Sequence, residues 1–238
     1  MPRENFGPGH TFLAKEEILT YEEMAKVVSS LLPLGLKKVR ITGGEPLLRK
    51  DIHVLIELLR SLDPELDLAL TTNGILLHKY ADILYQKGLN RVTVSLDAVE
   101  QKMFQQITDS RKTPSDVFAG IDQAMKSGMN VKVNCVVKKG VNENQIVPLA
   151  KQCIQRKIPV RFIEFMDVGT TNNWNIEAVM SGKEMRKVLR NHLGPLEPVA
   201  PKHPSDVARL WRLTDGSTIG FIESVTNPFC GNCTRARL

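Results

Sequence analysis

The chain has 238 residues, of which 42% are hydrophobic and 24% charged, so it can bury one large core and we expect one compact domain. No apolar run of about 18 residues occurs, and the first residues are unlike a signal or transit peptide, so the sequence predicts a cytoplasmic protein with no membrane-spanning helix. The net charge of +6 arises from scattered Lys and Arg. This argues against nucleic acid as a partner and favours a small phosphorylated ligand.

In chain order, short β-branched runs alternate with longer segments of helical periodicity, which predicts a repeated strand, loop and helix. The predicted strands are Lys38–Thr42, Leu66–Thr71, Arg91–Leu96, Asn130–Val137 and Val160–Phe165. The predicted helices are Tyr21–Leu32, Asp51–Leu62, Leu76–Lys87, Ser115–Ser127 and Asn144–Arg156. Gly35, Gly88 and Gly128 stand where helices should stop, which supports these boundaries.

This alternation indicates an α/β fold in which parallel strands are covered by helices on both faces. A closed or partial βα barrel and an open doubly wound sheet both satisfy the pattern, which leaves the choice open. After about Gly169 the chain becomes more polar, Gly194–Pro204 is rich in proline, and Leu210–Leu213 and Thr218–Ile222 flank an Asp-Gly turn. We expect a hairpin-bearing extension over the barrel, because about 70 residues could hardly build an independent core.

The residues that follow the predicted strands are unusually polar. In parallel βα architectures the ligand lies at the C-terminal ends of the strands, so these residues are the candidates for a site. They are Thr42–Pro46, Thr71–Gly74, Ser95–Asp97, Lys138–Gly140 and Glu164–Asp167.

The loop Gly43-Gly44-Glu45-Pro46 has the composition of a binding loop for a polar small molecule. Two glycines let the backbone approach a ligand closely, and a carboxylate held before a proline could receive an ammonium group or a ribose hydroxyl. A plain glycine turn, with Glu45 as a solvated acid at the start of a helix, is the alternative interpretation.

Cationic side chains recur on single faces of two predicted strands. Lys38 and Arg40 alternate on the first strand, as Lys132 and Asn134 do on a later one. A bound triphosphate or carboxylate would explain these cations together. Exposure on an edge strand, or pairing with an internal carboxylate such as Asp97 or Glu164, remains an alternative.

The four cysteines fall into two classes. Cys135 and Cys153 lie in apolar segments and are predicted to be core thiols, since four cysteines are too few for a disulfide scaffold of this size. Cys230 and Cys233 form a CxxC turn followed by Arg235. Such a pair binds an iron–sulfur cluster in some proteins, and in others is half of a zinc knuckle or a redox pair.

The motifs together resemble the MoaA family, the GTP 3',8-cyclases of molybdenum cofactor biosynthesis within the radical S-adenosylmethionine superfamily. The resemblance spans nearly the whole chain. It is carried by Val39–Leu47, Thr71–Gly74, Ser95–Ala98 and Phe229–Leu238.

The resemblance implies a partial βα barrel of the TIM type, with residues 1–168 as the radical S-adenosylmethionine barrel and 169–238 as a C-terminal extension. It also implies two [4Fe–4S] clusters, one of which cleaves S-adenosylmethionine to a radical. That radical would convert GTP to (8S)-3',8-cyclo-7,8-dihydroguanosine 5'-triphosphate. Other implied partners are an electron donor, a downstream pterin synthase that takes the product, and a second copy in a homodimer.

The family's site residues carry over by motif position. The implied S-adenosylmethionine contacts are Gly43, Gly44, Glu45, Pro46, Ser95 and Met166. The implied GTP contacts are Arg40, Thr71, Lys132, Arg235 and Arg237, whose cations suit phosphate oxygens. Cys230 and Cys233 would supply two of the three thiolates of the substrate-side cluster.

Two parts of the family pattern are expected to be missing. The family's CxxxCxxC loop ends before a Met-Pro pair like Met1-Pro2, and its third substrate-side cysteine follows beyond Leu238. A cluster that leaves one iron open needs three thiolates, so we expect the polypeptide of these residues to be inactive. Two other functions stay open: a non-catalytic nucleotide-binding protein, and a zinc-binding βα protein that uses Cys230 and Cys233.

Overall fold

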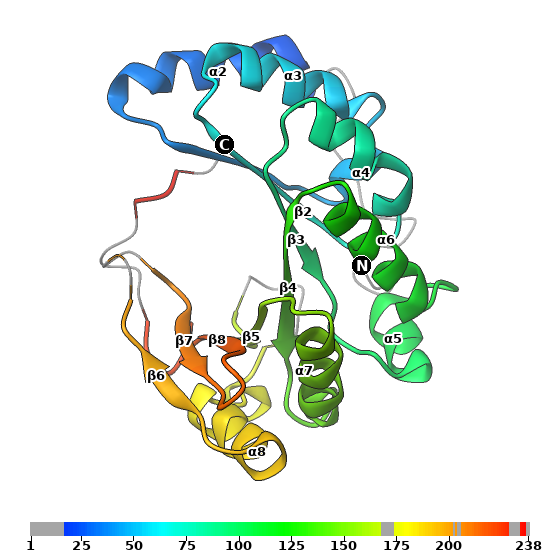
Figure 1. Ribbon diagram of the computed structural model, residues 1–238, viewed down its shortest axis with the longest axis vertical. Coiled ribbons are helices and arrows are strands. Elements are labelled where there is room, and N and C mark those ends of the chain that lie inside the picture. The colour runs from blue at the N-terminus through cyan, green and yellow to red at the C-terminus, as the bar shows by residue number, and fades with distance from the viewer. Residues whose placement is uncertain (1–16, 168–173, 202, 204–205, 229–233, 237–238) are drawn as a thin grey trace. The chain divides into compact units, whose positions relative to one another are not determined.

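The computed structural model describes residues 17–167, 174–201, 203, 206–228 and 234–236 (Figure 1). The chain forms two compact units. Among the described residues, the N-terminal unit comprises those up to Ser95 and Arg111–Val131, and the C-terminal unit comprises Leu96–Ser110 and those from Lys132 onward.

The N-terminal unit is built on the parallel strands β1 (Lys38–Ile41), β2 (Asp67–Thr72) and β3 (Arg91–Ser95), in that order. The inner residues of β2 and β3, such as Leu68 and Val94, are fully buried. The helices of this unit are α2 (Tyr21–Leu31), α3 (Ile52–Leu62), α4 (Leu77–Gln86) and α6 (Pro114–Lys126), with the 3₁₀ turns η2 (Leu32–Leu34) and η3 (Pro46–Leu48).

Local sequence signals explain where these helices begin and end. Thr20 and Thr113 form capping boxes with Glu23 and Asp116, which satisfy backbone N–H groups at the starts of α2 and α6. Gly35, Gly88 and Gly128 have φ angles of 89°, 103° and 102°, as their predicted role at helix ends requires. Every predicted helix and strand of this unit is present to within one residue at each end.

The C-terminal unit contains the larger sheet, in the order β4 (Asn130–Val137), β5 (Val160–Glu164), β8 (Thr218–Ile222), β7 (Arg209–Arg212) and β6 (Glu197–Val199). Strands β4, β5 and β8 are parallel, and β8, β7 and β6 are antiparallel. The first two residues of β4 belong to the N-terminal unit. The helices are α5 (Gln101–Thr108), α7 (Ile146–Gln155) and α8 (Gly182–Leu193), with η4 (Glu143–Gln145) and η5 (Ile176–Ala178).

One face of this larger sheet is a closed core. Cys135, Phe162 and Phe221 lie opposite one another on β4, β5 and β8, and each is fully buried. The two phenylalanine rings lie 6.2 Å apart between centroids. The opposite face carries the polar side chains described below.

Helices α5 and α8 and strand β6 of this unit were not predicted. Helix α8 begins at a Ser181–Glu184 capping box, a signal that is present in the sequence, and it buries Met185 and Leu189. Helix α5 buries Phe104 alone, so its apolar pattern is weak. Strand β6 contains Pro198 and lies at the sheet edge, where proline is tolerated.

The predicted hairpin is confirmed, with β8 at its predicted bounds and a turn in which Gly216 has φ 86°. No helix within the described ranges is both long and apolar enough to cross a membrane. The predicted boundary between a barrel at 1–168 and an extension at 169–238 stays a prediction.

Candidate functional site

The loops that follow β1 and β2 are joined through the carboxylate of Glu45. Its Oε1 accepts hydrogen bonds from the Leu47 N–H (3.0 Å) and the Thr72 hydroxyl (2.7 Å), and its Oε2 accepts one from the Asn73 N–H (2.7 Å). The strand-end residues Gly43–Pro46 and Thr71–Gly74 therefore lie side by side, as the parallel order predicted.

The two glycines of this loop present bare backbone. Among the described residues, and apart from the adjoining chain, no atom lies within 4 Å of a Cβ added at Gly43 or Gly44. Gly43 has φ 146°, which L side chains rarely adopt. Pro46 is buried and begins η3, with Glu45 as its N-cap. The loop is thus fixed at Glu45 and open at the glycines, as close contact with a ligand requires.

Arg40, Thr71 and Ser95 share one face of the N-terminal sheet. Arg40 is opposite Ala69, and Thr71, two residues further on, is opposite Thr93, two residues before Ser95. Since side chains alternate along strands, the register places all three on the same side. The sequence predicted a shared face only for Lys38 and Arg40 on β1. The strand register adds Thr71 and Ser95 to that face.

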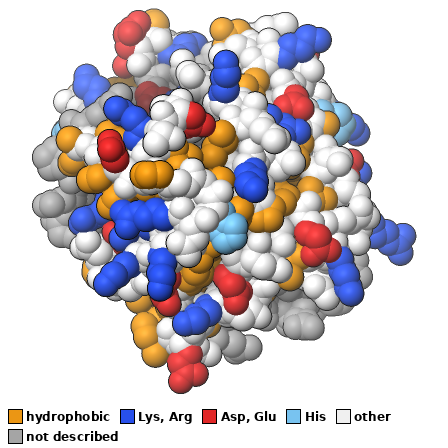
Figure 2. Space-filling model, turned by 60° about the horizontal axis from the view of Figure 1, so that its bottom comes forward, with side chains coloured by type: hydrophobic (Ala, Val, Ile, Leu, Met, Phe, Trp, Pro, Cys, Tyr) orange, Lys and Arg blue, Asp and Glu red, His pale blue; other side chains and the backbone are white. Residues whose placement is uncertain are grey.

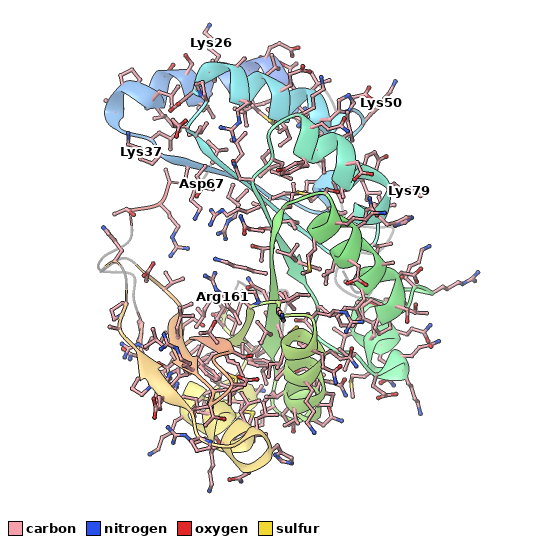
Figure 3. The ribbon with its side chains drawn as sticks, in the orientation of Figure 1. Lys26, Lys37, Lys50, Asp67, Lys79 and Arg161 are labelled. Atoms are coloured by element: carbon pink, nitrogen blue, oxygen red, sulfur yellow. The ribbon has the colours of Figure 1, made fainter. Side chains whose placement is uncertain are left out.

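A carboxylate partner does exist for one predicted cation, but it is Asp67 and not Asp97 or Glu164. The Asp67 carboxylate lies 3.9 Å from Lys38 Nζ and 2.8 Å from an Arg91 nitrogen. Figure 3 labels Asp67 and its neighbour Lys37, whose carbonyl accepts from the Asp67 N–H. Lys38 is exposed on β1, the edge strand of the described sheet, so the structure favours the alternative of an edge-strand position, and its contact with Asp67 is a surface ion pair.

The C-terminal unit carries a second polar face. Asn134 on β4 is opposite Arg161 on β5, which Figure 3 labels, so the strand register places Lys132, Asn134 and Arg161 on one side. All three residues are half-buried. Asn134 Oδ1 is buried and has no hydrogen-bond partner among the described residues. The two cations suit an anionic group of a ligand, and the unsatisfied amide oxygen can accept a hydrogen bond from a donor on the same ligand. Arg161 was missed, because on sequence it is a single cation in an otherwise apolar strand.

On the face shown in Figure 2, basic and acidic side chains are spread among neutral ones, in keeping with the scattered charge in the sequence. The charge pattern favours a small anion over a polyanion.

Asp97 ends the candidate segment Ser95–Asp97, which lies at the end of β3. Its Oδ1 accepts a hydrogen bond from the Val136 N–H (2.8 Å), and its backbone carbonyl accepts one from the Asn142 side chain (2.9 Å). Burial raises the pKa of Asp97 from 3.8 to about 6, although the Val136 N–H works in the opposite direction. A carboxyl group with such a raised pKa at a strand end is a functional candidate.

Asp97 predicts a pH dependence of stability. Because its pKa is higher in the folded protein, the protonated form stabilises the fold below about pH 4, and this stabilisation is lost as the pH rises towards 6. Each pKa unit is worth about 1.4 kcal/mol. Allowing for partial solvation, we expect Asp97→Asn to be more stable than wild type at pH 7 by about 2 kcal/mol.

Urea unfolding of both proteins at pH 4, 5, 6 and 7 checks this. The difference between the variant and wild type should grow from pH 4 to pH 6 and then level off. A constant difference across the range would show that Asp97 does not titrate there.

Phe165 and Met166 follow β5, and Phe165 has contacts with Lys138 and Trp174. Lys138 Nζ lies 4.7 Å from the centre of the Phe165 ring, and the Trp174 indole N–H donates to the Phe165 carbonyl (3.0 Å). The Met166 side chain is 43% exposed, so it is accessible to a ligand. Arg235 is also exposed.

The described cysteines do not fit an iron–sulfur cluster. Cys135 and Cys153 are fully buried, which confirms the prediction of core thiols. Burial raises the pKa of Cys153 to about 12 and that of Cys135 well above its ordinary value, so both stay protonated, whereas cluster ligands are thiolates. Within the described ranges no three His, Cys, Asp or Glu side chains form a metal-binding group. Cys230, Cys233 and Arg237 lie outside those ranges.

Comparison with protein families divides the chain in two. Residues 6–153 match the Radical SAM superfamily, and residues 158–238 match the family described as Molybdenum Cofactor Synthesis C. The second match covers the segment that holds the CxxC motif.

Curated relatives match along the entire chain. It is 47% identical over 239 residues to a GTP 3',8-cyclase of Staphylococcus epidermidis, and 45% identical to one of Staphylococcus aureus. Each alignment covers 100% of this chain and 70% of the relative.

Solved structures share the fold. Streptococcus suis SuiB bound to S-adenosylmethionine matches with a TM-score of 0.60 and 20% identity, over 77% of this chain and 43% of that chain. Methylornithine synthase (PylB) matches with a TM-score of 0.58 and 17% identity, over 72% of this chain and 52% of that chain. These likenesses confirm the expected α/β fold with an incomplete βα barrel. By its sequence and its fold, the chain belongs to the GTP 3',8-cyclase family of the radical S-adenosylmethionine enzymes.

Proposed function

We propose that the protein converts GTP to (8S)-3',8-cyclo-7,8-dihydroguanosine 5'-triphosphate, in the synthesis of the molybdenum cofactor. Family membership and the polar strand ends of both units support this. S-adenosylmethionine and a [4Fe–4S] cluster, when bound, supply the radical chemistry. The residues of this chain bind the two substrates, orient them and exclude water.

The proposed S-adenosylmethionine contacts are the open backbone at Gly43 and Gly44, with Pro46 fixing the end of the loop, and the side chains of Ser95 and Met166. Bare glycine backbone suits an amino group, which donates to carbonyl oxygens. The exposed Met166 suits an apolar contact with the adenosine part.

The proposed GTP contacts are Arg40, Thr71, Lys132, Arg235 and Arg237, to which we add Arg161. The single observation that carries this assignment is that Lys132, Asn134 and Arg161 share one half-buried face of β4 and β5. An ammonium and a guanidinium group on one half-buried face can both donate charge-assisted hydrogen bonds to phosphate oxygens. A triphosphate offers enough oxygen acceptors for both side chains.

We expect Lys132→Ala and Arg161→Ala each to raise the dissociation constant for GTP at least tenfold. A hydrogen bond to a charged group contributes about 1.5–3 kcal/mol, which corresponds to about 10- to 100-fold in affinity. Isothermal titration of the protein with GTP, GMP and guanosine measures the effect. The loss should be greatest for GTP and smallest for guanosine, and it should shrink as salt rises.

Lys183→Ala and Arg212→Ala are matched controls, because each removes the same charge from an exposed position on α8 or β7 of the same unit. They should leave the dissociation constant for GTP within about twofold of wild type, because salt screens the interaction of an exposed charge with a distant ligand. Equal losses for GTP and guanosine in Lys132→Ala and Arg161→Ala would contradict a phosphate role for these residues.

We further propose that a polypeptide limited to residues 1–238 binds nucleotide but does not form the product. It contains four cysteines, of which Cys135 and Cys153 are core thiols. Cys230 and Cys233 alone are fewer than the three thiolates that each cluster needs. An electron donor, hand-off of the product to a pterin synthase, a homodimer and a cytoplasmic location belong to the same proposal.

A further inference from the structure

We propose that Glu45 is a positioning residue: by its hydrogen bonds to the buried Thr72 hydroxyl and the Asn73 N–H, it holds the glycine loop in place to bind S-adenosylmethionine. The Thr72 hydroxyl is part of this hydrogen-bond network. The inference rests on the proposed S-adenosylmethionine site. It replaces a direct contact between the Glu45 carboxylate and the methionine ammonium with an indirect one. Thr72 is thereby assigned a role that sequence analysis did not suggest.

Groups of the protein fill most of the hydrogen-bond acceptor positions of the Glu45 carboxylate. It accepts three hydrogen bonds of 2.7 to 3.0 Å, from the Thr72 hydroxyl and from the backbone N–H groups of Leu47 and Asn73. An ionised carboxylate offers about four acceptor positions, so about one remains. Short bonds to a charged acceptor are strong, and a ligand ammonium would have to compete with them for the same oxygens.

Thr72 links the two strand-end loops. Its hydroxyl donates to Glu45 Oε1 and accepts from the Gly74 N–H (3.1 Å), so both its donor and an acceptor position are used. Its exposed fraction is 2%, and it is the last residue of β2. A side chain so buried reaches no ligand. Thr72 can therefore affect ligand affinity only by positioning Glu45 and the Gly74 N–H.

The glycine loop that precedes Glu45 is the segment that must become ordered when a ligand binds. Gly43 and Gly44 have no side chains, and no described atom beyond the adjoining chain lies within 4 Å of their Cβ positions, so side-chain packing among the described residues does not order them. Glycine backbone loses much conformational entropy when it is ordered. An anchor at the adjacent Glu45 lowers that cost before the ligand arrives, which raises affinity without contact.

The test compares Thr72→Val, which keeps the shape but removes the hydroxyl, with Thr72→Ser, which keeps the hydroxyl. The dissociation constant for S-adenosylmethionine is measured by isothermal titration of the protein, alongside that for GTP. We expect Thr72→Val to weaken S-adenosylmethionine binding about tenfold and GTP binding little. Thr72→Ser should restore most of the loss. Thr72→Ala gives the same test if the valine does not fit.

Thr108→Val is the matched control. Its hydroxyl also makes a 2.7 Å hydrogen bond, to the Phe104 carbonyl within α5, and its loss should not change S-adenosylmethionine affinity. Thermal melting of each variant identifies any that do not fold.

The outcomes separate the two proposals. If Thr72→Val and Thr72→Ala bind S-adenosylmethionine as tightly as wild type while Glu45→Gln does not, Glu45 contacts the ligand directly and this inference is wrong. If wild type itself does not bind S-adenosylmethionine, the proposed function fails, and the inference fails with it.

Discussion

Glu164→Ala is expected to destabilise the C-terminal unit by about 4 kcal/mol or more, the cost of leaving several buried donors without acceptors. Glu164 ends β5 and has no exposed surface. Its Oε1 accepts from the Gly182 N–H (2.9 Å) and the Thr226 hydroxyl (2.5 Å). Its Oε2 accepts from the N–H groups of Val225 (2.9 Å) and Thr226 (2.8 Å).

The size of the effect follows from what the variant leaves behind. Three backbone N–H groups would lose their acceptor, and each unsatisfied buried donor costs about 1–3 kcal/mol. A cavity adds to this cost. The sequence hypothesis that Glu164 pairs with a cation is therefore replaced, because the described donors to Glu164 are backbone amides and a hydroxyl.

Urea unfolding of Glu164→Ala and Glu164→Gln measures the loss. Glutamine keeps one acceptor oxygen but turns an amide towards two donors, so it should lie between alanine and wild type. Glu197→Ala, at an exposed position of β6, is the control and should change stability by less than about 0.5 kcal/mol. A loss below about 1 kcal/mol in Glu164→Ala would contradict the assigned role.

Gly120→Ala is expected to cost about 3 kcal/mol, although alanine in a helix is normally about 1 kcal/mol better than glycine. Gly120 lies within α6 and is buried. A Cβ there would lie 2.3 Å from the Gly74 carbonyl oxygen and 3.0 Å from Leu77 Cβ. The Gly74 carbonyl is backbone and accepts from the Leu77 N–H (3.1 Å), so the chain itself must move.

Ala119→Gly provides the matched control for this variant. Ala119 is the exposed neighbour in the same helix, and its change to glycine should cost about 1 kcal/mol from helix propensity alone. Thermal or urea unfolding of both variants separates propensity from steric overlap. If Gly120→Ala were as stable as wild type, the close approach of α6 to Gly74 would be wrong.

The same variant connects stability to the proposed site. Gly74 follows Asn73, whose N–H donates to Glu45. Displacement of the Gly74 carbonyl by a methyl group would therefore disturb the loop that Glu45 anchors. Asn73 and Gly74 hold their geometry partly because α6 carries no side chain at position 120.

Much of the fold was predictable because it depends on local chemistry. The five predicted strands and five predicted helices exist, and β4 and β8 have their predicted bounds. Alternation along a strand correctly placed Lys38 with Arg40 and Lys132 with Asn134 on common faces. The elements that were missed are short, edge-located or weakly apolar, as in α5 with one buried side chain.

The sequence by itself determined the order of helices and strands, the polar strand ends, the core character of Cys135 and Cys153, and the family. These depend on periodicity, on helix and turn signals within a few residues, and on motifs formed by consecutive residues. The tertiary structure alone decided that Arg161 faces the same way as Lys132, that Asp67 is the partner of Lys38, and that Glu45 and Glu164 hold backbone amides. Such pairings depend on strand register and on loops far apart in the chain, and no local preference encodes them.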